Sequence, residues 1–113
     1  MIESNCLFCQ ILRKDIPAEI VFENDKVVAF KDINPIAKVH LLFIHRNHSQ
    51  NINEMTNNPQ DILDIYSAIK KFSLEKEYSE SGFRVITNLG KNACQTVFHT
   101  HFHFLAGEKL SWS

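Results

Sequence analysis

The sequence predicts an α+β fold in which a mostly antiparallel sheet of five strands packs around one long helix, with a short helix at the N-terminus. Several short segments are rich in β-branched and aromatic residues, as strands are. One longer segment repeats apolar residues at helical spacing. The chain of 113 residues is 44% hydrophobic and has nine Phe, enough for one core, and no linker or repeat divides it. We therefore predict a single domain over residues 1–113.

The first third of the chain predicts a short helix and a hairpin. Residues 8–13 form an apolar and basic run that suits one or two helical turns before Pro17. Residues 19–23 and 26–31 predict two strands, because β-branched and aromatic side chains dominate both. The turn formers Asn24 and Asp25 stand between them, which is a hairpin signal.

The middle of the chain predicts a third strand over residues 38–45 and then the long helix. Asn58 suits the N-cap of this helix and Pro59 its first position. The apolar residues that follow at helical spacing predict one stripe that belongs to the core or to a subunit contact: Ile62, Ile65, Tyr66, Ile69 and Phe72.

The last third predicts two more strands, over residues 83–87 and 97–105. Because side chains alternate along a strand, three histidines of the fifth strand should share one face, about 6.6 Å apart from one to the next: His99, His101 and His103. The other face should pack on the long helix through Phe98, Thr100, Phe102 and Phe104.

Composition excludes some classes of function. Twelve basic residues against 13 acidic ones argue against a general nucleic-acid binder. The polar start of the chain does not read as a secretory signal, and the apolar runs are too short to cross a bilayer. We expect a cytoplasmic protein that does not bind membranes.

The row of histidines allows three interpretations. It can be the solvent face of an amphipathic strand, or a metal tripod, although three ligands in one row rarely converge on one ion. It can also divide roles, since imidazole serves as nucleophile, acid and phosphate donor near neutral pH. Histidines without a local carboxylate suit chemistry on an anionic group such as phosphate, and we favour this interpretation.

The segment from His99 to Leu105 resembles the His-φ-His-φ-His-φ-φ signature of the histidine triad (HIT) superfamily. Ala106-Gly107 and Trp112 are similar to the tail of its Hint branch. Further matching segments follow in the family's order: Phe30 to Pro35, His40 to Ile44, Asn88 to Gly90 and Gln95 to Val97. The resemblance implies the HIT fold, a homodimer, and hydrolysis of purine nucleoside phosphoramidates at the α-phosphate. A nucleotidyl-histidine would form and release a nucleoside monophosphate.

The resemblance also implies roles for single residues. His101 matches the nucleophile, His103 a phosphate-holding histidine and His99 the first residue of the triad. Asp32 matches a residue that binds ribose hydroxyls, with Phe30 and Ile33 lining the nucleoside pocket. The residues that match the surroundings of the phosphate and leaving group are Asn88, Gln95, Thr96 and Val97. His40 matches a histidine beside the triad.

The sequence departs from the family pattern at Thr96, where many relatives have Ser, and at two further positions. Cys94 stands where the family usually has Gly, and its side chain could narrow the approach of the phosphate or require a different turn. His45 stands where Pro is common, and we interpret it as a surface substitution.

Cys6 and Cys9 form a C-x-x-C pair, which alone fits a redox pair, two buried thiols or metal ligands. A redox pair usually precedes a helix in a βαβ unit, and that pattern is missing here. The resemblance to bacterial relatives implies a structural zinc site completed by His48 and His99. The chemistry itself would need no metal.

Two other functions remain open. The same histidine could hydrolyse dinucleoside polyphosphates. The chain could also be a zinc-stabilised nucleotide-binding regulator in which catalysis is vestigial.

Overall fold

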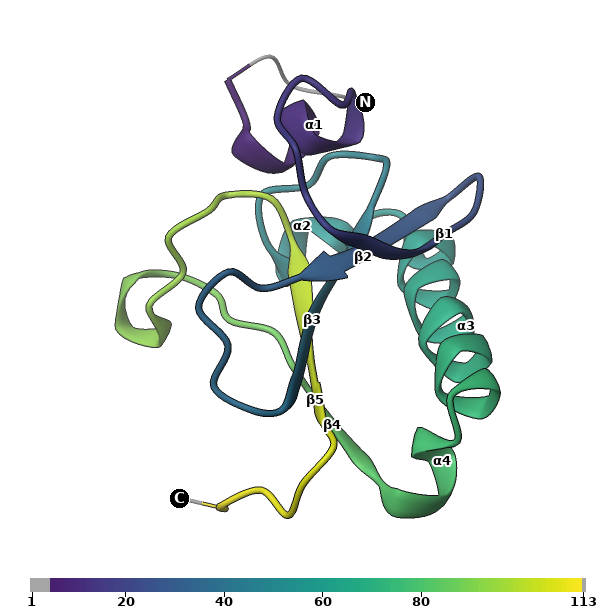
Figure 1. Cartoon of the computed structure of the whole chain (residues 1–113). Helices are drawn as coiled ribbons and strands as arrows, with labels where there is room; N and C mark the ends of the chain where they lie inside the picture. The colour runs from purple at the N-terminus through teal and green to yellow at the C-terminus, as the bar shows by residue number, and fades with distance from the viewer. Residues whose placement is uncertain (1–4, 113) are drawn as a thin grey trace.

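The computed structural model describes residues 5–112 and confirms the α+β prediction. Its strands pair antiparallel in the order β1-β2-β3-β5-β4 (Figure 1). The strands are β1 (Ile20–Glu23), β2 (Val27–Lys31), β3 (Val39–His45), β4 (Phe83–Ile86) and β5 (His101–Ala106). The helices are α1 (Leu7–Leu12), α2 (Ile52–Met55), α3 (Pro59–Glu75) and α4 (Tyr78–Ser81), and η1 (Lys91–Ala93) is a 3₁₀ turn.

The hairpin between β1 and β2 closes as predicted. The Asn24 side-chain oxygen accepts hydrogen bonds from the backbone N–H groups of Lys26 (2.8 Å) and Val27 (2.7 Å). The Asn24 N–H donates to the Val27 carbonyl at 2.9 Å. This side chain therefore replaces backbone partners inside the turn.

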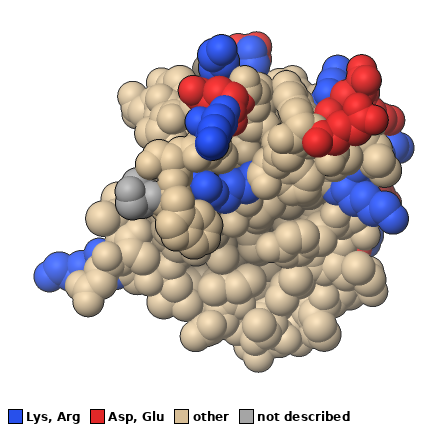
Figure 2. Space-filling model, turned by 90° about the horizontal axis from the view of Figure 1, so that it is seen from below, with Lys and Arg blue, Asp and Glu red and all other residues tan. Residues whose placement is uncertain are grey.

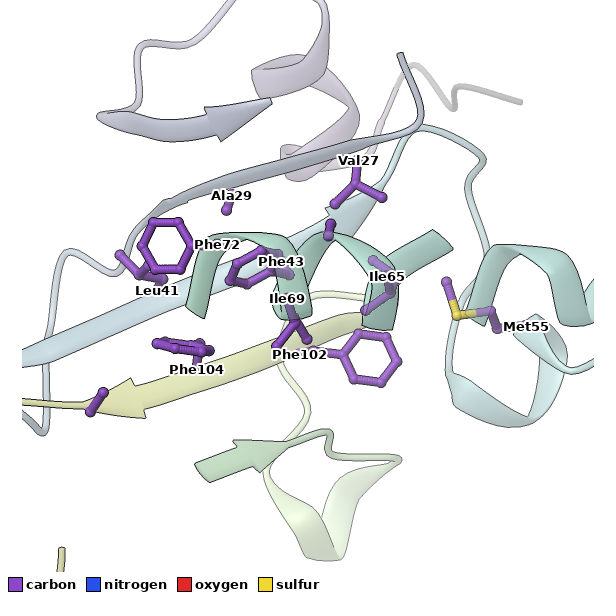
Figure 3. Close-up of a cluster of buried hydrophobic side chains, with 12 residues drawn as sticks. Val27, Ala29, Leu41, Phe43, Met55, Ile65, Ile69, Phe72, Phe102 and Phe104 are labelled. Carbon is purple, nitrogen blue, oxygen red and sulfur yellow. The ribbon is translucent and has the colours of Figure 1, made fainter. Parts of the chain in front are cut away.

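Helix α3 covers one face of the sheet, and the larger hydrophobic core lies between them (Figure 3). Pro59 is at the start of the helix, and Asn58 occupies the N-cap without a side-chain capping bond. Ile65, Ile69 and Phe72 are buried against the sheet, as the apolar stripe predicts. Every second side chain of β2, β3 and β5 packs into the same core: Val27, Ala29, Leu41, Phe43, Phe102 and Phe104.

Helix α1 packs on the opposite face. Phe8, Ile11 and Leu12 contact the alternate side chains of β2 and β3 in a second cluster. Because Phe102 and Phe104 point toward α3, His101 and His103 of β5 point to the α1 face. Strand alternation thus places the large hydrophobic core on the α3 face and the polar His101 and His103 on the α1 face.

The predicted fifth strand begins too early. Strand β5 starts at His101, because the Thr100 N–H donates to the Ser49 carbonyl (2.8 Å) and the Thr100 hydroxyl bonds the Ser49 hydroxyl (2.6 Å) rather than joining the ladder. His99 consequently lies before the strand, outside the row formed by His101 and His103. The expectation that Phe98 packs on the long helix is also wrong, since its side chain is 60% exposed.

The four-residue helices α2 and α4 and the turn η1 were not predicted. Segments this short hold little more than one helical turn, so they carry no apolar periodicity. Among the described residues, no helix is both long and apolar enough to cross a membrane.

Candidate functional site

A cavity of about 560 Å³ opens on the α1 face of the sheet. Seven of the predicted site residues line it: Phe30, Asp32, Ile33, Thr96, Val97, His101 and His103. Phe30 is buried, whereas Ile33 is 91% exposed and stands at the rim. Among the described residues, the predicted Asn88, Gln95 and His99 do not line this cavity.

The ring of His101 is held in one tautomer. Its Nδ1 lies 2.7 Å from the His99 carbonyl oxygen, which only accepts, so Nδ1 carries the proton. Nε2 is left with a lone pair. Burial lowers the pKa of His101, against the opposing effects of the bond to the His99 carbonyl and the charge of Asp32. The ring is therefore neutral at pH 7 and offers a nucleophilic nitrogen.

The tautomer of His103 is set through His40 by the backbone N–H of Ile36, in the loop between β2 and β3. The Ile36 N–H donates to His40 Nδ1 at 3.1 Å, so a neutral His40 carries its proton on Nε2. That nitrogen lies 2.9 Å from His103 Nδ1, which accepts the bond. His103 then carries its own proton on Nε2, ready to donate to an anion.

Burial also sets the charge of these two rings. It lowers the pKa of His103 to about 4, helped by the neighbouring charges of His101 and His40. It lowers the pKa of His40, partly offset by the carboxylate of Asp32. Asp32 Oδ2 lies 3.3 Å from His40 Nε2, while Asp32 Oδ1 accepts from the Asn34 N–H at 2.8 Å. The Asp32 carboxylate therefore stabilises the turn that follows it and also lines the cavity.

The loop before β5 is braced by Gln95. Its side-chain oxygen accepts from the Gly90 N–H (3.0 Å), and its side-chain nitrogen donates to the Gln50 carbonyl (2.7 Å). Gln95 is buried, so these bonds shape the loop from behind, while Thr96 is exposed at the cavity. Cys94 adopts the left-handed conformation (φ 62°) that a Gly would accept without strain, and its thiol is exposed.

Sequence reasoning missed Phe8. This residue of α1 sets its ring edge-on to His101 at 5.1 Å between centroids, and to Phe30 at 5.4 Å. It therefore forms an apolar wall of the cavity beside the candidate nucleophile. Its place between Cys6 and Cys9 is the signal that could have marked it, since a cluster of those thiols with His99 brings α1 close to the start of β5.

A second cluster, of Cys6, Cys9, His48 and His99, joins α1 to the loop after β3 and to the loop before β5. Cys6 Sγ lies 3.3 Å from His99 Nδ1, and Cys9 Sγ lies 3.4 Å from His48 Nδ1. The two Nδ1 atoms are 3.2 Å apart. Zinc held tetrahedrally at about 2.3 Å from sulfur and about 2.05 Å from nitrogen places N and N about 3.3 Å apart, and S and N about 3.6 Å apart. The four predicted ligands therefore fit one zinc ion.

The geometry around His99 supports the same fit. Its Nε2 lies 3.0 Å from the His45 carbonyl, which fixes the proton there and turns the Nδ1 lone pair to the thiols. Burial lowers the pKa of His99 to about 4, so the ring is neutral, as a ligand must be.

The interpretation of His45 as a surface residue is wrong. Its side chain is 2% exposed and faces two carboxylates of α3, those of Asp61 and Asp64. The local sequence around His45 does not reveal this, because both acids lie more than 15 positions further on.

Comparison with known proteins places this site in context. The model of the HIT domain family matches residues 13–110. A HIT family hydrolase from Clostridium thermocellum superposes with a TM-score of 0.91 at 41% identity, covering 98% of this chain and 97% of that one. A 14 kDa zinc-binding protein of Zea mays is 35% identical over 97% of this chain and 88% of its own length. The adenylylsulfatase HINT1 of Arabidopsis thaliana is 36% identical over 97% of this chain and 76% of its own length.

Proposed function

The chain belongs to the HIT domain family, and on that basis we propose that it hydrolyses purine nucleoside phosphoramidates at the α-phosphate. The coarser activity, that of a hydrolase, agrees with the Clostridium thermocellum relative. The observation that carries the finer proposal is the pair of opposite tautomers in one cavity. His101 presents a lone pair on Nε2 and His103 presents a proton on Nε2.

In the first step, His101 Nε2 attacks the α-phosphorus and the bond from phosphorus to the leaving amine breaks. The amine leaves with the bonding electron pair and takes up a proton from solvent. The imidazole becomes positively charged once it is bonded to phosphorus, and the His99 carbonyl, 2.7 Å from Nδ1, stabilises this charge through the retained N–H.

In the second step, water attacks the nucleotidyl-histidine and gives up a proton to solvent. The bond from phosphorus to Nε2 breaks, its electron pair returns to the now neutral ring, and nucleoside monophosphate leaves. In both steps the Nε2–H of His103 donates a hydrogen bond to a phosphate oxygen and so stabilises the charge of the transition state. His40 acts through His103, because its Nε2–H keeps the His103 proton on the side that faces the cavity.

The cavity also supplies a place for the nucleoside. Phe30 and the exposed Ile33 form apolar walls for a purine base, and Asp32 stands at the same rim to accept from ribose hydroxyls. We therefore assign these three residues to nucleoside binding, and Thr96 and Val97, which line the same cavity, to the surroundings of the phosphate.

Adenylylsulfate is a second candidate substrate. The Arabidopsis relative is named for its hydrolysis, and that molecule also carries an α-phosphate with a good leaving group. The same attack by His101 would release sulfate without protonation. Comparing kcat/KM for adenylylsulfate and for an adenosine phosphoramidate separates the two.

We further propose that the Cys6, Cys9, His48 and His99 cluster holds a structural zinc ion. Zinc would tie α1, and with it Phe8, to the start of β5. Because the ligands need free thiolates, this role suits a reducing compartment such as the cytoplasm.

We also propose a homodimer. Strand β4 is an edge strand, and beside it lies a hollow of about 400 Å³ that includes Tyr66, Leu74 and Phe83, all partly or largely exposed. Figure 2 shows a face of the molecule with a broad area free of Lys, Arg, Asp and Glu. Sedimentation should show a dimer that Leu74→Glu dissociates and Lys71→Glu, on the same helix but outside the hollow, does not. A stable 13 kDa species in the wild type contradicts the dimer.

The test of the catalytic proposal is rapid quenching of a single turnover with an adenosine phosphoramidate. Mass spectrometry should find a nucleotidyl group on the peptide that carries His101, and it should be missing in His101→Ala. Turnover without any trapped intermediate, or with one on another residue, would overturn the assignment of the nucleophile.

A further inference from the structure

A second cavity, of about 510 Å³, lies at the end of the sheet where β2 ends and β3 begins, and the proposed hydrolase chemistry does not use it. It opens on the α3 face of the sheet, because four of its lining residues belong to the core cluster under α3 or pack against it: Val21, Val39, Leu41 and Phe72. The cavity that holds His101 opens on the opposite face. Among the described residues, the two cavities have only Lys31 and Asp32 in common.

The base of this second cavity is apolar. Leu41 and Phe72 are buried, whereas Val21, Val39 and Tyr78 are only half-buried. The ring of Tyr78 lies 6.1 Å from that of Phe72, so an aromatic surface continues from the core into the cavity. A cavity of this volume with apolar walls is large enough for the body of a small organic ligand.

The charges of the lining are mostly positive, with three lysines against the single carboxylate of Asp32. Lys31 Nζ lies 2.8 Å from Glu19 Oε2, so its charge is already paired. Lys38 and Lys76 are exposed, and within residues 5–112 neither forms an ion pair. Two unpaired ammonium groups therefore line an apolar cavity in a chain whose formal charge is −1.

The acids and the imidazole near these lysines are held by other partners. Asp32 Oδ1 accepts from the Asn34 N–H at 2.8 Å, and Asp32 Oδ2 lies 3.3 Å from His40 Nε2. His40 is buried, and its Nε2–H is already bonded within the candidate catalytic site. Glu108 Oε2 accepts from the backbone N–H of Lys38 at 2.7 Å, which leaves the ammonium group of Lys38 unpaired. The groups left to bind a charged ligand are thus cations, which select an anion.

We propose that this cavity binds a phosphate monoester with an apolar body, such as an aryl or alkyl phosphate. The phosphate carries close to two negative charges at neutral pH, which the ammonium groups of Lys38 and Lys76 balance. Lysine ammonium groups have three donors on a flexible stem and bind phosphate as compact charges. The apolar body covers the half-buried side chains of Val21, Val39 and Tyr78. This is binding alone, in which no bond of the ligand breaks, and it does not depend on the proposed hydrolase activity.

The experiment titrates the ¹⁵N-labelled protein with 1-naphthyl phosphate and follows backbone amide signals by NMR. We expect saturable shifts at Val21, Val39 and Tyr78, which line the cavity. Inorganic phosphate alone should bind at least ~10-fold more weakly, because it leaves the apolar walls uncovered.

Matched variants separate this cavity from its surroundings. Lys38→Glu and Lys76→Glu should each raise the Kd of 1-naphthyl phosphate by ~10-fold or more, because an attractive contact becomes a repulsive one. Lys71→Glu makes the same change of charge on α3 but outside the lining, and it should bind like the wild type. His103→Ala alters the other cavity and should also leave the Kd unchanged.

The opposite results overturn the proposal. The wild type could show no saturable shift, or shifts confined to Thr96 and Val97 that disappear in His103→Ala, which would place the probe in the cavity of His101. Equal weakening by Lys71→Glu and Lys76→Glu would show a general effect of charge and no site. Inorganic phosphate that binds as tightly as 1-naphthyl phosphate would refute the role of the apolar walls.

Discussion

His99 and His101 stand two residues apart in the chain but belong to regions with different chemistry. The His99 ring lies with Cys6, Cys9 and His48, and its Nε2 is bound to the His45 carbonyl. The His101 ring lines the cavity, and its Nδ1 is bound to the His99 carbonyl. In each ring one nitrogen donates its N–H to a backbone carbonyl, and the other nitrogen keeps its lone pair.

The difference teaches that the role of a histidine depends on which nitrogen its partners leave unprotonated. His99 is left with Nδ1, which points to two thiols, as the proposed zinc site requires. His101 is left with Nε2, which points to an open cavity, as the proposed nucleophilic attack requires. Both rings are buried, and burial lowers the pKa of both, so charge alone does not distinguish them.

The largest expected effect separates the two regions by activity. His101→Ala should lower phosphoramidate hydrolysis by ~10⁴-fold or more, because no other group can form the covalent intermediate. Its zinc content and melting temperature should stay close to those of the wild type, since His101 is outside the Cys and His cluster. Phe98→Ala, an exposed neighbour, serves as the control and should keep full activity. Steady-state kinetics and metal analysis check both expectations. Loss of zinc together with activity in His101→Ala would show that the two regions are not independent.

The converse variant should affect stability first. Cys9→Ser removes a buried ligand, and we expect loss of zinc and a fall in unfolding free energy of about 4 kcal/mol, in the range for loss of a metal. Activity should fall only as far as α1 and Phe8 loosen. Cys94→Ser changes an exposed thiol outside the cluster and is the matched control. Thermal melts with zinc analysis test this, and an unchanged melting temperature after zinc removal by a chelator would contradict it.

Sequence patterns predicted the parts of the fold that repeat. The alternation in β2 and β3 and the apolar stripe of α3 are local signals, and the structure confirms them. The start of β5 was misplaced because the sequence alternation runs on through His99 and Phe98, whereas the backbone of Thr100 bonds to Ser49 in a distant loop. Sequence periodicity does not show which backbone group forms a hydrogen bond with which partner.

The site could be predicted in its residue types but not in its proton positions. The resemblance supplied His101, His103 and the four cluster residues, and seven predicted residues meet in one cavity. The tautomer of His103 depends on the Ile36 N–H, which acts through His40, and no sequence signal carries that contact. His45 was misread for the same reason, since its partners come from α3.

Within the cavity, a double variant measures how far His40 works through His103. His103→Ala should cost ~10²-fold to ~10³-fold in kcat, as for loss of one transition-state donor. His40→Ala should cost less, about 10-fold, because it only frees the His103 ring to change tautomer. The double variant should match His103→Ala alone, since both changes act on the same donor, the Nε2–H of His103. Independent losses that multiply would show that His40 acts on its own.

The protonation of His103 predicts a pH effect on stability. Burial lowers its folded pKa to about 4, below the ordinary value of 6.5, so between these values the unfolded chain binds a proton that the folded chain does not. Stability should therefore fall as pH falls from about 6.5 to about 4. Urea unfolding should show a shallower pH slope in His103→Asn than in the wild type, since protonation of the zinc ligands contributes to both. Parallel slopes would contradict a depressed pKa.

The smallest effect concerns the loop that leads into both regions. Cys94 holds a left-handed conformation at φ 62°, which costs a residue with a side chain roughly 1–2 kcal/mol. Gly would remove that cost but lose about 0.4–1 kcal/mol through its freer unfolded chain. Cys94→Gly should therefore stabilise the fold by about 0.5 kcal/mol, while Cys94→Ala, which keeps the strain, should not. The Gln95 contacts to Gly90 and Gln50 depend on the backbone turn and not on the thiol, so kcat and zinc content should be unchanged. A rise in kcat of several fold in Cys94→Gly would instead mean that the thiol narrows the path of the phosphate to His101.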